Sequence, residues 1–102
     1  MNETRFEFDP EKNRRNLERH GVDLEWAQRL WDGDFVITEA RPVLDETRFS
    51  ILARIESKCY VAVFTMRDEV VRLISCHRAD RRLERIYESE IEERKKGEAD
   101  HR

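Results

Sequence analysis

The sequence lacks any long apolar run, and no stretch approaches the roughly 18 to 20 apolar residues that cross a membrane. The first residues, MNETRFEFDP, contain no apolar core of a signal peptide, which predicts a cytoplasmic protein. Only three Gly are present, at scattered positions, and this excludes a Gly-rich loop that cradles phosphate. The three His show no metal-ligand spacing, and no Ser-His-Asp or Cys-His pattern is evident. We therefore expect neither a metal nor another cofactor.

Cysteine is also scarce, with Cys59 and Cys76 as the two examples. Both lie in strand-like runs, so we expect two reduced, mostly buried thiols rather than a disulfide. The 102 residues are sufficient for one modest core, to which Trp26, Trp31 and five Phe contribute. We predict a single domain over residues 1–95 and a flexible tail over residues 96–102.

Charge is abundant but unevenly distributed. The net charge is −3, yet residues 41–85 hold ten Lys and Arg against seven Asp and Glu. The remainder of the chain holds ten basic and sixteen acidic residues. A basic middle on an acidic body is compatible with a local phosphate-binding face, because steering depends on the local field. Solvated surface charge explains the same pattern equally well.

The N-terminal region predicts a short strand and an unusually polar helix. RFEF, residues 5–8, alternates polar and apolar side chains as a half-buried strand does. A helix follows, with Asp9 as its N-cap, Pro10 in its first turn and Gly21 after its end. Its one strongly apolar residue is Leu17, so the helix is expected to be exposed. Its polar side chains form a candidate binding surface: Lys12, Asn13, Arg14, Arg15, Asn16, Arg19 and His20.

The rest of the chain predicts an α+β fold with two N-terminal helices, an antiparallel β-sheet meander and a C-terminal helix. A second helix over residues 24–31 has Leu24, Ala27, Leu30 and Trp31 at helical spacing. Strands are predicted over residues 35–40, 47–55, 59–66 and 70–76, joined by short links. The run 59–66 is nearly all apolar and is expected in the centre of the sheet. The final helix spans residues 79–95 and packs through Leu83, Ile86, Tyr87 and Ile91.

Three polar clusters are candidates for chemistry. Glu46 and Arg48 share one face of a strand, Arg67 and Arg72 flank a hairpin, and His77 and Arg78 lie where the last strand meets the last helix. Cleavage of RNA without a metal needs a base for the 2′-hydroxyl, cations for the phosphorane and an acid for the leaving oxygen. Arg offers a bidentate fork for phosphate, and either Glu46 or His77 is suited to exchange protons.

Structural explanations compete with each of these assignments. Glu46 and Arg48 are two residues apart and are suited to an ordinary ion pair. His77 is equally suited to be a polar residue at a junction. The Arg residues of the last helix follow helical spacing and are compatible with a solvated face, and Trp26 and Trp31 are expected in the core rather than as base-stacking platforms.

Several spaced motifs resemble the BrnT toxin family. FEFDPEKNRRNLERHGVDLEWA is similar to the family's opening run, DETR contains its E-x-R element, and FTMRDEVVRLISCHRADRRLERIYE resembles its closing section. The similarity covers about residues 6 to 88. It implies a RelE-like fold and a type II toxin that cleaves RNA without a metal. It also implies a ribbon-helix-helix antitoxin, BrnA-like, through which the complex binds operator DNA.

The resemblance implies site residues as well. Glu46, Arg48, Arg67, Arg72 and Arg78 are the candidate catalytic positions. The residues expected to contact RNA are Phe8, Lys12 and Arg54.

The chain departs from the family pattern at His77, where many members have Arg. Either His77 transfers protons, or Arg78 supplies the missing charge, or activity is weakened. Because a one-residue shift along a strand reverses the face, Arg78 is not automatically a substitute. The departure keeps an alternative open, a catalytically weak or inactive binding module that acts as a co-repressor with the antitoxin. A nuclease that depends on the ribosome is a third possibility.

Overall fold

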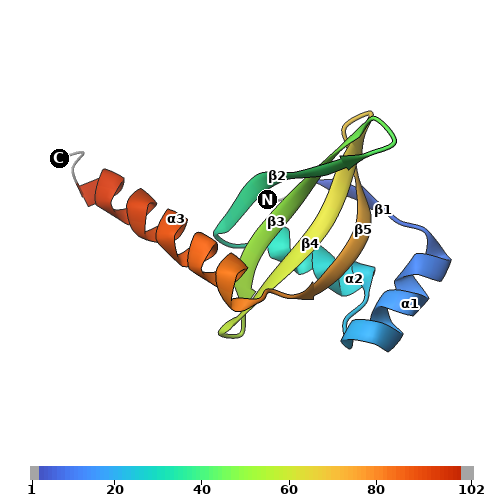
Figure 1. Cartoon of the computed structure of the whole chain (residues 1–102), viewed down its shortest axis with the longest axis horizontal. Helices are drawn as coiled ribbons and strands as arrows, with labels where there is room; N and C mark the ends of the chain where they lie inside the picture. The colour runs from blue at the N-terminus through green and yellow to red at the C-terminus, as the bar shows by residue number, and fades with distance from the viewer. Residues whose placement is uncertain (1–2, 100–102) are drawn as a thin grey trace.

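The computed structural model describes residues 3–99, which form an α+β fold with three α-helices and a five-stranded sheet (Figure 1). The elements follow in the order β1 (Arg5–Glu7), α1 (Pro10–His20), α2 (Leu24–Ala27), the 3₁₀-helix η1 (Gln28–Trp31), β2 (Phe35–Val43), β3 (Glu46–Ile55), β4 (Lys58–Arg67), β5 (Val70–Arg78) and α3 (Arg81–Ala99). None of these helices is long and apolar enough to cross a membrane. The three helices and the sheet confirm the predicted α+β class, and the differences in detail are described below.

The sheet has the strand order β1-β5-β4-β3-β2. Strands β2 to β5 form the predicted antiparallel meander, and the apolar strand β4 lies at its centre. The prediction of a wholly antiparallel sheet is wrong, because β1 pairs with β5 in parallel, with Phe6 opposite Val71. A three-residue strand carries no directional signal in its sequence, and its pairing is set by the path of the chain through α1 and α2.

The three hairpins of the meander all close through two-residue turns. Leu44–Asp45, Glu56–Ser57 and Asp68–Glu69 occupy these turns, and all six residues have positive φ, between 49° and 69°. Positive φ at both central residues is the geometry whose twist matches that of the flanking strands. The tight turns fix the register of the four strands and therefore the face on which every side chain lies.

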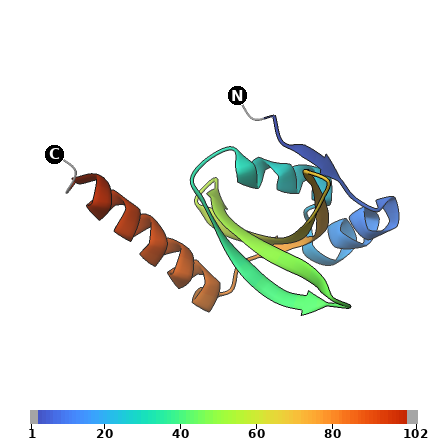
Figure 2. The ribbon, with the colours of Figure 1, turned by 90° about the horizontal axis from the view of Figure 1, so that it is seen from above.

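The larger core lies on the inner face of the sheet, which curves around α2 and η1 (Figure 2). Leu24, Ala27 and Leu30 are fully buried there, as their spacing predicts. The predicted helix over residues 24–31 is α-helical for one turn only and continues as η1. Trp31 packs between Phe6 and Phe64 at the open end of this core, which confirms it as a packing residue.

Helix α3 covers part of the opposite, outer face of the sheet and then projects away from it (Figure 1). Leu83, Tyr87 and Ile91 pack at successive turns against a small second core, whereas Ile86 is 38% exposed. The expectation that Ile86 belongs to the packing stripe is therefore wrong. The helix extends to Ala99 rather than ending near residue 95, and residues 100–102 of the predicted tail lie outside the described residues.

Helix α1 lies beside β5, where the short strand β1 no longer covers its edge. Asp9 caps the helix by accepting from the Glu11 and Lys12 amides, and Gly21 ends it at φ 78°, both as predicted. The Asn16 amide donates to the Cys76 carbonyl at 2.7 Å and accepts from the Cys76 N–H at 3.0 Å. It also donates to the Val22 carbonyl at 2.7 Å.

One side chain thus replaces a missing strand at the edge of β5. Asn16 is only 6% exposed, and Asn13 accepts from the Leu24 amide at 2.6 Å. The expectation that these two asparagines belong to a polar binding surface is therefore wrong. They fasten α1 to the sheet and to the start of α2.

Replacing Asn16 with Ala is expected to lower the free energy of unfolding by about 2–5 kcal/mol, because the buried N–H and C=O groups of Cys76 both lose their partner. Urea titration followed by circular dichroism measures the change. The control is Leu17→Ala, since Leu17 is 50% exposed and is expected to cost less than about 1 kcal/mol. Equal losses in the two variants would contradict this role of Asn16.

Candidate functional site

The outer face of the sheet gathers most of the predicted site residues. Alternation along β3 places Glu46, Arg48 and Arg54 on this face, opposite the buried Ile51 and its neighbours on the inner core. The registers of β4 and β5 add Arg67, Arg72 and His77 to the same face. The sheet thus places Arg48 and Arg72 on one face.

Four strands contribute to one row across this face. The β3–β4 register continues from Phe49 opposite Phe64 to Arg48 opposite Thr65, and the Thr65 hydroxyl donates to the Thr47 carbonyl at 2.7 Å. Thr65 pairs with Arg72, and Arg72 pairs with Glu7 of β1. Since neighbouring strands lie about 4.8 Å apart, the Arg48 and Arg72 backbones are about 10 Å apart. Long Arg side chains at this separation can address a single phosphate between them.

Two carboxylates lie among these guanidinium groups. Arg72 donates to Glu7 at 2.9 Å, and Arg67 donates to Glu46 at 3.2 Å. Glu46 therefore pairs with Arg67 of the facing strand and not with Arg48, contrary to the expected ion pair. Glu7 was not selected from the sequence, although the polar and apolar alternation of RFEF already placed it on the face opposite Phe6.

Arg48 differs from Arg67 and Arg72 in having no carboxylate as an ion-pair partner. It forms no ion pair with any residue from 3 to 99, and its Nε atom is buried without a hydrogen-bond partner. A buried donor without a partner costs free energy, so the site favours an acceptor that supplies one. The cluster of Arg48, Arg67, Arg72, Glu7 and Glu46, here called the arginine cluster, is an anion-binding arrangement with built-in carboxylates.

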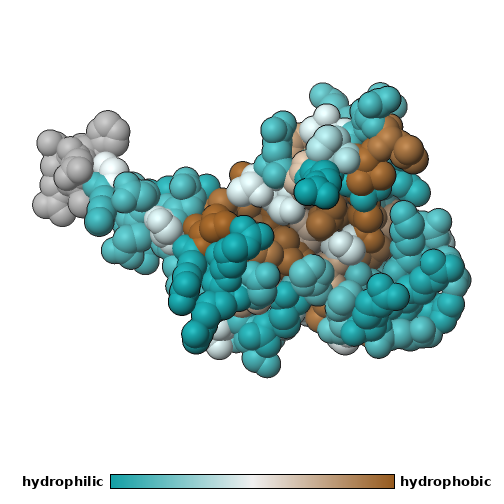
Figure 3. All heavy atoms as spheres, viewed as in Figure 1, coloured by the Kyte–Doolittle hydropathy of each residue, from teal (hydrophilic) through white to brown (hydrophobic). Residues whose placement is uncertain are grey.

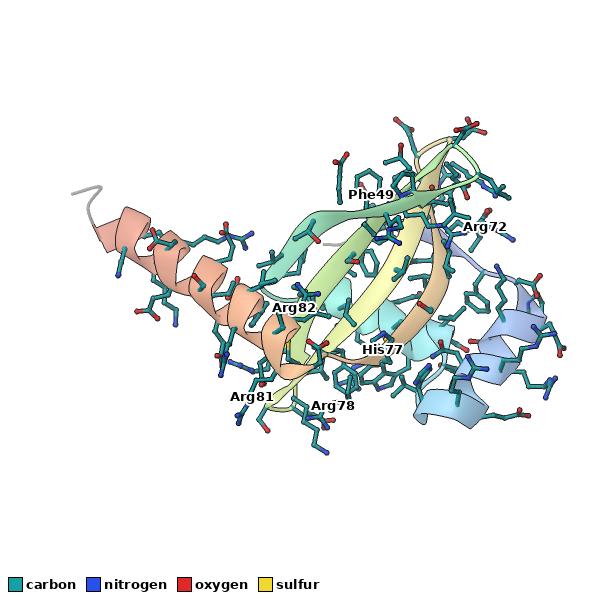
Figure 4. All side chains as sticks on the ribbon, in the orientation of Figure 1. Phe49, Arg72, His77, Arg78, Arg81 and Arg82 are labelled. Atoms are coloured by element: carbon teal, nitrogen blue, oxygen red, sulfur yellow. The ribbon has the colours of Figure 1, made fainter. Side chains whose placement is uncertain are left out.

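His77 lies toward the other end of β5 from Arg72 (Figure 4). The residues opposite them on β4, Val61 and Thr65, are four positions apart, so the two backbones are about 13 Å apart. Its Nδ1 atom is 2.8 Å from the Arg78 carbonyl oxygen. A carbonyl only accepts, so Nδ1 carries the proton and Nε2 keeps a free lone pair in the neutral ring. The ring faces His20 of α1, with 5.2 Å between the centroids. His77 is thus oriented as a proton acceptor, but at a distance from the arginine cluster.

Arg78 lies on the opposite face of the sheet from His77. It pairs with Tyr60, and its guanidinium carbon is 5.7 Å from the centroid of the Tyr60 ring. Trp26 packs edge-on against the same ring at 4.6 Å. The structure therefore does not bring Arg78 to the arginine cluster, since consecutive strand residues face opposite sides.

The residues predicted to contact RNA occupy three different environments. Arg54 bonds to Glu88 at 2.9 Å and lies 5.5 Å from the Tyr87 ring centroid, so it holds α3 against the sheet. Phe8 is partly buried and packs against the inner core. Lys12 is exposed on α1. Of the three, Lys12 alone is free of such structural contacts.

Apolar side chains lie between the hydrophilic side chains of α1 and those of α3 on this view of the outer face (Figure 3). Figure 3 looks onto this face and shows an apolar strip over the strands, bordered by hydrophilic side chains on α1 and α3. Within residues 3–99, no three His, Cys, Asp or Glu side chains are grouped as metal ligands would be. The side chains available for chemistry are thus guanidinium groups, carboxylates and two imidazoles.

A family model describes the same span of sequence that builds this face. The model of the ribonuclease toxin BrnT, of type II toxin-antitoxin systems, matches residues 8–82. The chain belongs to the BrnT family. The match contains Arg48, Arg67 and Arg72, and the family description implies that a BrnT protein has a protein antitoxin as its partner. No curated protein matches the chain.

The two cysteines of this BrnT protein are free and buried, as the sequence predicts. Burial raises the pKa of the Cys76 thiol to about 12 and also raises the pKa of Cys59. The thiolate is the nucleophilic form, so neither residue is suited to nucleophilic catalysis near neutrality.

At pH 8, we expect Cys76 to resist iodoacetamide in the folded protein, because only about one thiol in 10⁴ is ionised at a pKa of about 12. In denaturant both cysteines should react at the rate of ordinary thiols. Mass spectrometry of the alkylated protein gives the extent of labelling at each cysteine. Rapid labelling of Cys76 without denaturant would show that β5 is more open than the structure indicates.

Proposed function

We propose that the chain is a RelE-like endoribonuclease toxin that cleaves RNA without a metal ion. The main support is the row formed by Arg48 and Arg72 across the sheet, where Arg48 lacks a partner among the described residues and Arg67 lies beside it. Guanidinium groups bind phosphate through two parallel hydrogen bonds and stay charged at every physiological pH. Family membership provides the second line of support.

In the proposed reaction, Arg48 and Arg72 hold the non-bridging oxygens of the scissile phosphate. The 2′-oxygen attacks phosphorus after losing its proton, the P–O5′ bond breaks, and the products are a 2′,3′-cyclic phosphate and a 5′-hydroxyl. The guanidinium groups stabilise the additional negative charge of the phosphorane, and such groups contribute most where charge develops. The leaving 5′-oxygen takes a proton from solvent, because this face is open to water.

We assign removal of the 2′-hydroxyl proton to Glu46. It lies on the same face of β3 as Arg48 and two residues away, which is about 7 Å along the strand. An imidazole is a common general base, but the distance of about 13 Å between the His77 and Arg72 backbones places His77 near a neighbouring nucleotide. Geometry takes precedence over pKa in choosing a base.

We further propose that the antitoxin is a ribbon-helix-helix protein and that the complex binds operator DNA through it, in the cytoplasm. The support is the resemblance of the motifs to the BrnT family together with the family's toxin-antitoxin description. In this view the chain itself contacts RNA when free and contacts protein when neutralised.

Replacing Arg48 or Arg72 with Ala is expected to reduce RNA cleavage in EDTA by about 100-fold or more, since one transition-state donor is typically worth that much. Gel analysis of a labelled RNA measures the rate, and circular dichroism verifies the fold. The matched control is Arg81→Ala, which removes an exposed guanidinium on α3 far from Arg72 (Figure 4).

Two outcomes would contradict the nuclease assignment. Purified protein that leaves RNA intact, both naked and in a translating extract, would argue for the alternative of a binding module. If expression of the protein causes no growth arrest although it binds tightly to the antitoxin encoded by the neighbouring gene, the same alternative would be favoured. Arrest that the antitoxin relieves is the result expected for the nuclease.

The choice between the two proton acceptors is tested by Glu46→Gln and His77→Gln. Glu46→Gln is expected to lower the cleavage rate by a factor of 10²–10⁴ with little change in RNA affinity, whereas His77→Gln is expected to change the rate by less than tenfold. Neither should affect folding strongly, because the Glu46 pair is exposed and worth about 1 kcal/mol or less. A reversed order of effects would assign the base to His77.

A further inference from the structure

Helix α1 presents a row of basic side chains toward β5. Lys12, Arg15, Arg19 and His20 lie at the spacing i, i+3, i+7 and i+8, which places them on one face of the helix. Together with Asn16 and Ile74 they line a hollow of about 230 Å³ between α1 and β5. This hollow, here called the α1–β5 hollow, is separate from the arginine cluster.

The hollow is held in shape by the contacts of Asn16. Its bidentate hydrogen bond to Cys76 fixes the middle of α1 against β5. The β4–β5 register shifts between Val63 and Phe64, so Ile74 has no opposite residue and is displaced from the regular alternation. The basic side chains therefore project from a fixed backbone rather than from a loop.

Acidic residues of α1 neutralise mainly the other side of the helix. Glu11 and Glu18 both pair with Arg14, and Glu11 is 3.6 Å from Arg15. Neither Lys12 nor Arg19 forms an ion pair with any residue that the structure describes. Lys12 and Arg19 thus bring positive charge to the hollow without an ion-pair partner among the described residues.

His20 lines the hollow, and its ring lies beside that of His77, with 5.2 Å between the centroids. Burial lowers the pKa of His20, and the nearby positive charges of His77 and Arg19 lower it further. An anion in the hollow would oppose all of these effects by stabilising protonated His20. His20 is therefore a natural reporter for the presence of an anion.

Helix α1, which carries the hollow, begins close to the arginine cluster. The positive charges of Lys12 and Arg72 both contribute to lowering the pKa of the Asp9 carboxylate at the start of α1. Glu7, two residues earlier, forms an ion pair with Arg72. From Lys12 to Arg19 the helix rises about 10 Å. Basic groups thus follow one another from Arg48 and Arg72 along α1 to His20 and His77.

We propose that the α1–β5 hollow binds a backbone phosphate of single-stranded RNA next to the phosphate held by the arginine cluster. The site uses Lys12 and Arg19 as its main cations and sets the path of the substrate along α1. This inference rests on the proposed ribonuclease function and extends it from the scissile phosphate to the flanking nucleotides. Backbone contacts of this kind position the strand and carry no base preference of their own.

The test uses a fluorescein-labelled 2′-O-methyl RNA oligonucleotide, which cannot be cleaved because its 2′-oxygen carries no proton. Fluorescence anisotropy at several salt concentrations gives the affinity and its salt dependence. Lys12→Ala and Arg19→Ala are each expected to weaken binding about threefold to tenfold and to reduce the salt slope by about 0.7. Arg14→Ala is the matched control, since it removes the same charge from the opposite side of α1.

Proton NMR of the same complex gives a second readout, which is first measured on the wild-type protein. The His20 imidazole proton resonances are expected to shift on addition of the oligonucleotide, and the pKa of His20 is expected to rise. In the Lys12→Ala, Arg19→Ala double variant the shift should shrink, whereas in Arg14→Ala it should persist.

The outcomes separate this proposal from the function on which it rests. If RNA is cleaved and Arg48→Ala abolishes cleavage, but the α1 variants bind like Arg14→Ala, the hollow is not a phosphate site. Loss of antitoxin binding with unchanged RNA binding would assign the surface to the protein partner and overturn the proposal. If the wild-type protein neither binds nor cleaves RNA, both proposals are wrong.

Discussion

The bidentate hydrogen bond between the Asn16 side chain and the Cys76 backbone is the contact on which the arrangement of the molecule depends. Strand β1 pairs with only three residues of β5, so the remainder of that edge would expose unpaired backbone groups. Buried backbone groups need partners, and Asn16 supplies both at once. Because Asn16 also binds the Val22 carbonyl, one amide links α1, β5 and the approach to α2.

The second constraint is the register of the meander. Each hairpin closes with two residues, so no strand can slip by one position without moving its whole apolar set to the wrong face. The register places Arg48, Arg67 and Arg72 together on the outer face, and it also separates His77 from Arg78. Neighbours in sequence thus have unrelated environments, one beside His20 and the other against Tyr60.

The cations of the protein divide into two groups by what they contact. Arg54 and Arg78 lie against aromatic rings, and Arg54 is also held by acidic groups of α3, so these cations contribute to packing. Arg48 and Arg19 have no carboxylate partner among residues 3–99 and remain available to an external anion. Composition alone cannot make this distinction, because every Arg contributes the same charge to the sum.

The sequence by itself determined the local elements and the faces of the strands. Asp9 and Gly21 marked the ends of α1 because capping is a local interaction, and the alternation along β3 already separated Arg48 from Phe49. Alternation also carried the information that Glu7 and Phe6 lie on opposite sides.

Tertiary structure decided what depends on contacts between distant residues. The pairing of Glu46 with Arg67, the parallel addition of β1 and the burial of Asn16 join residues 21, 65 and 60 positions apart in the chain. No local pattern specifies such partners, because the sequence around a polar residue does not show whether its side chain contacts water, a carboxylate or the edge of a strand. Only the folded chain shows which of them it meets.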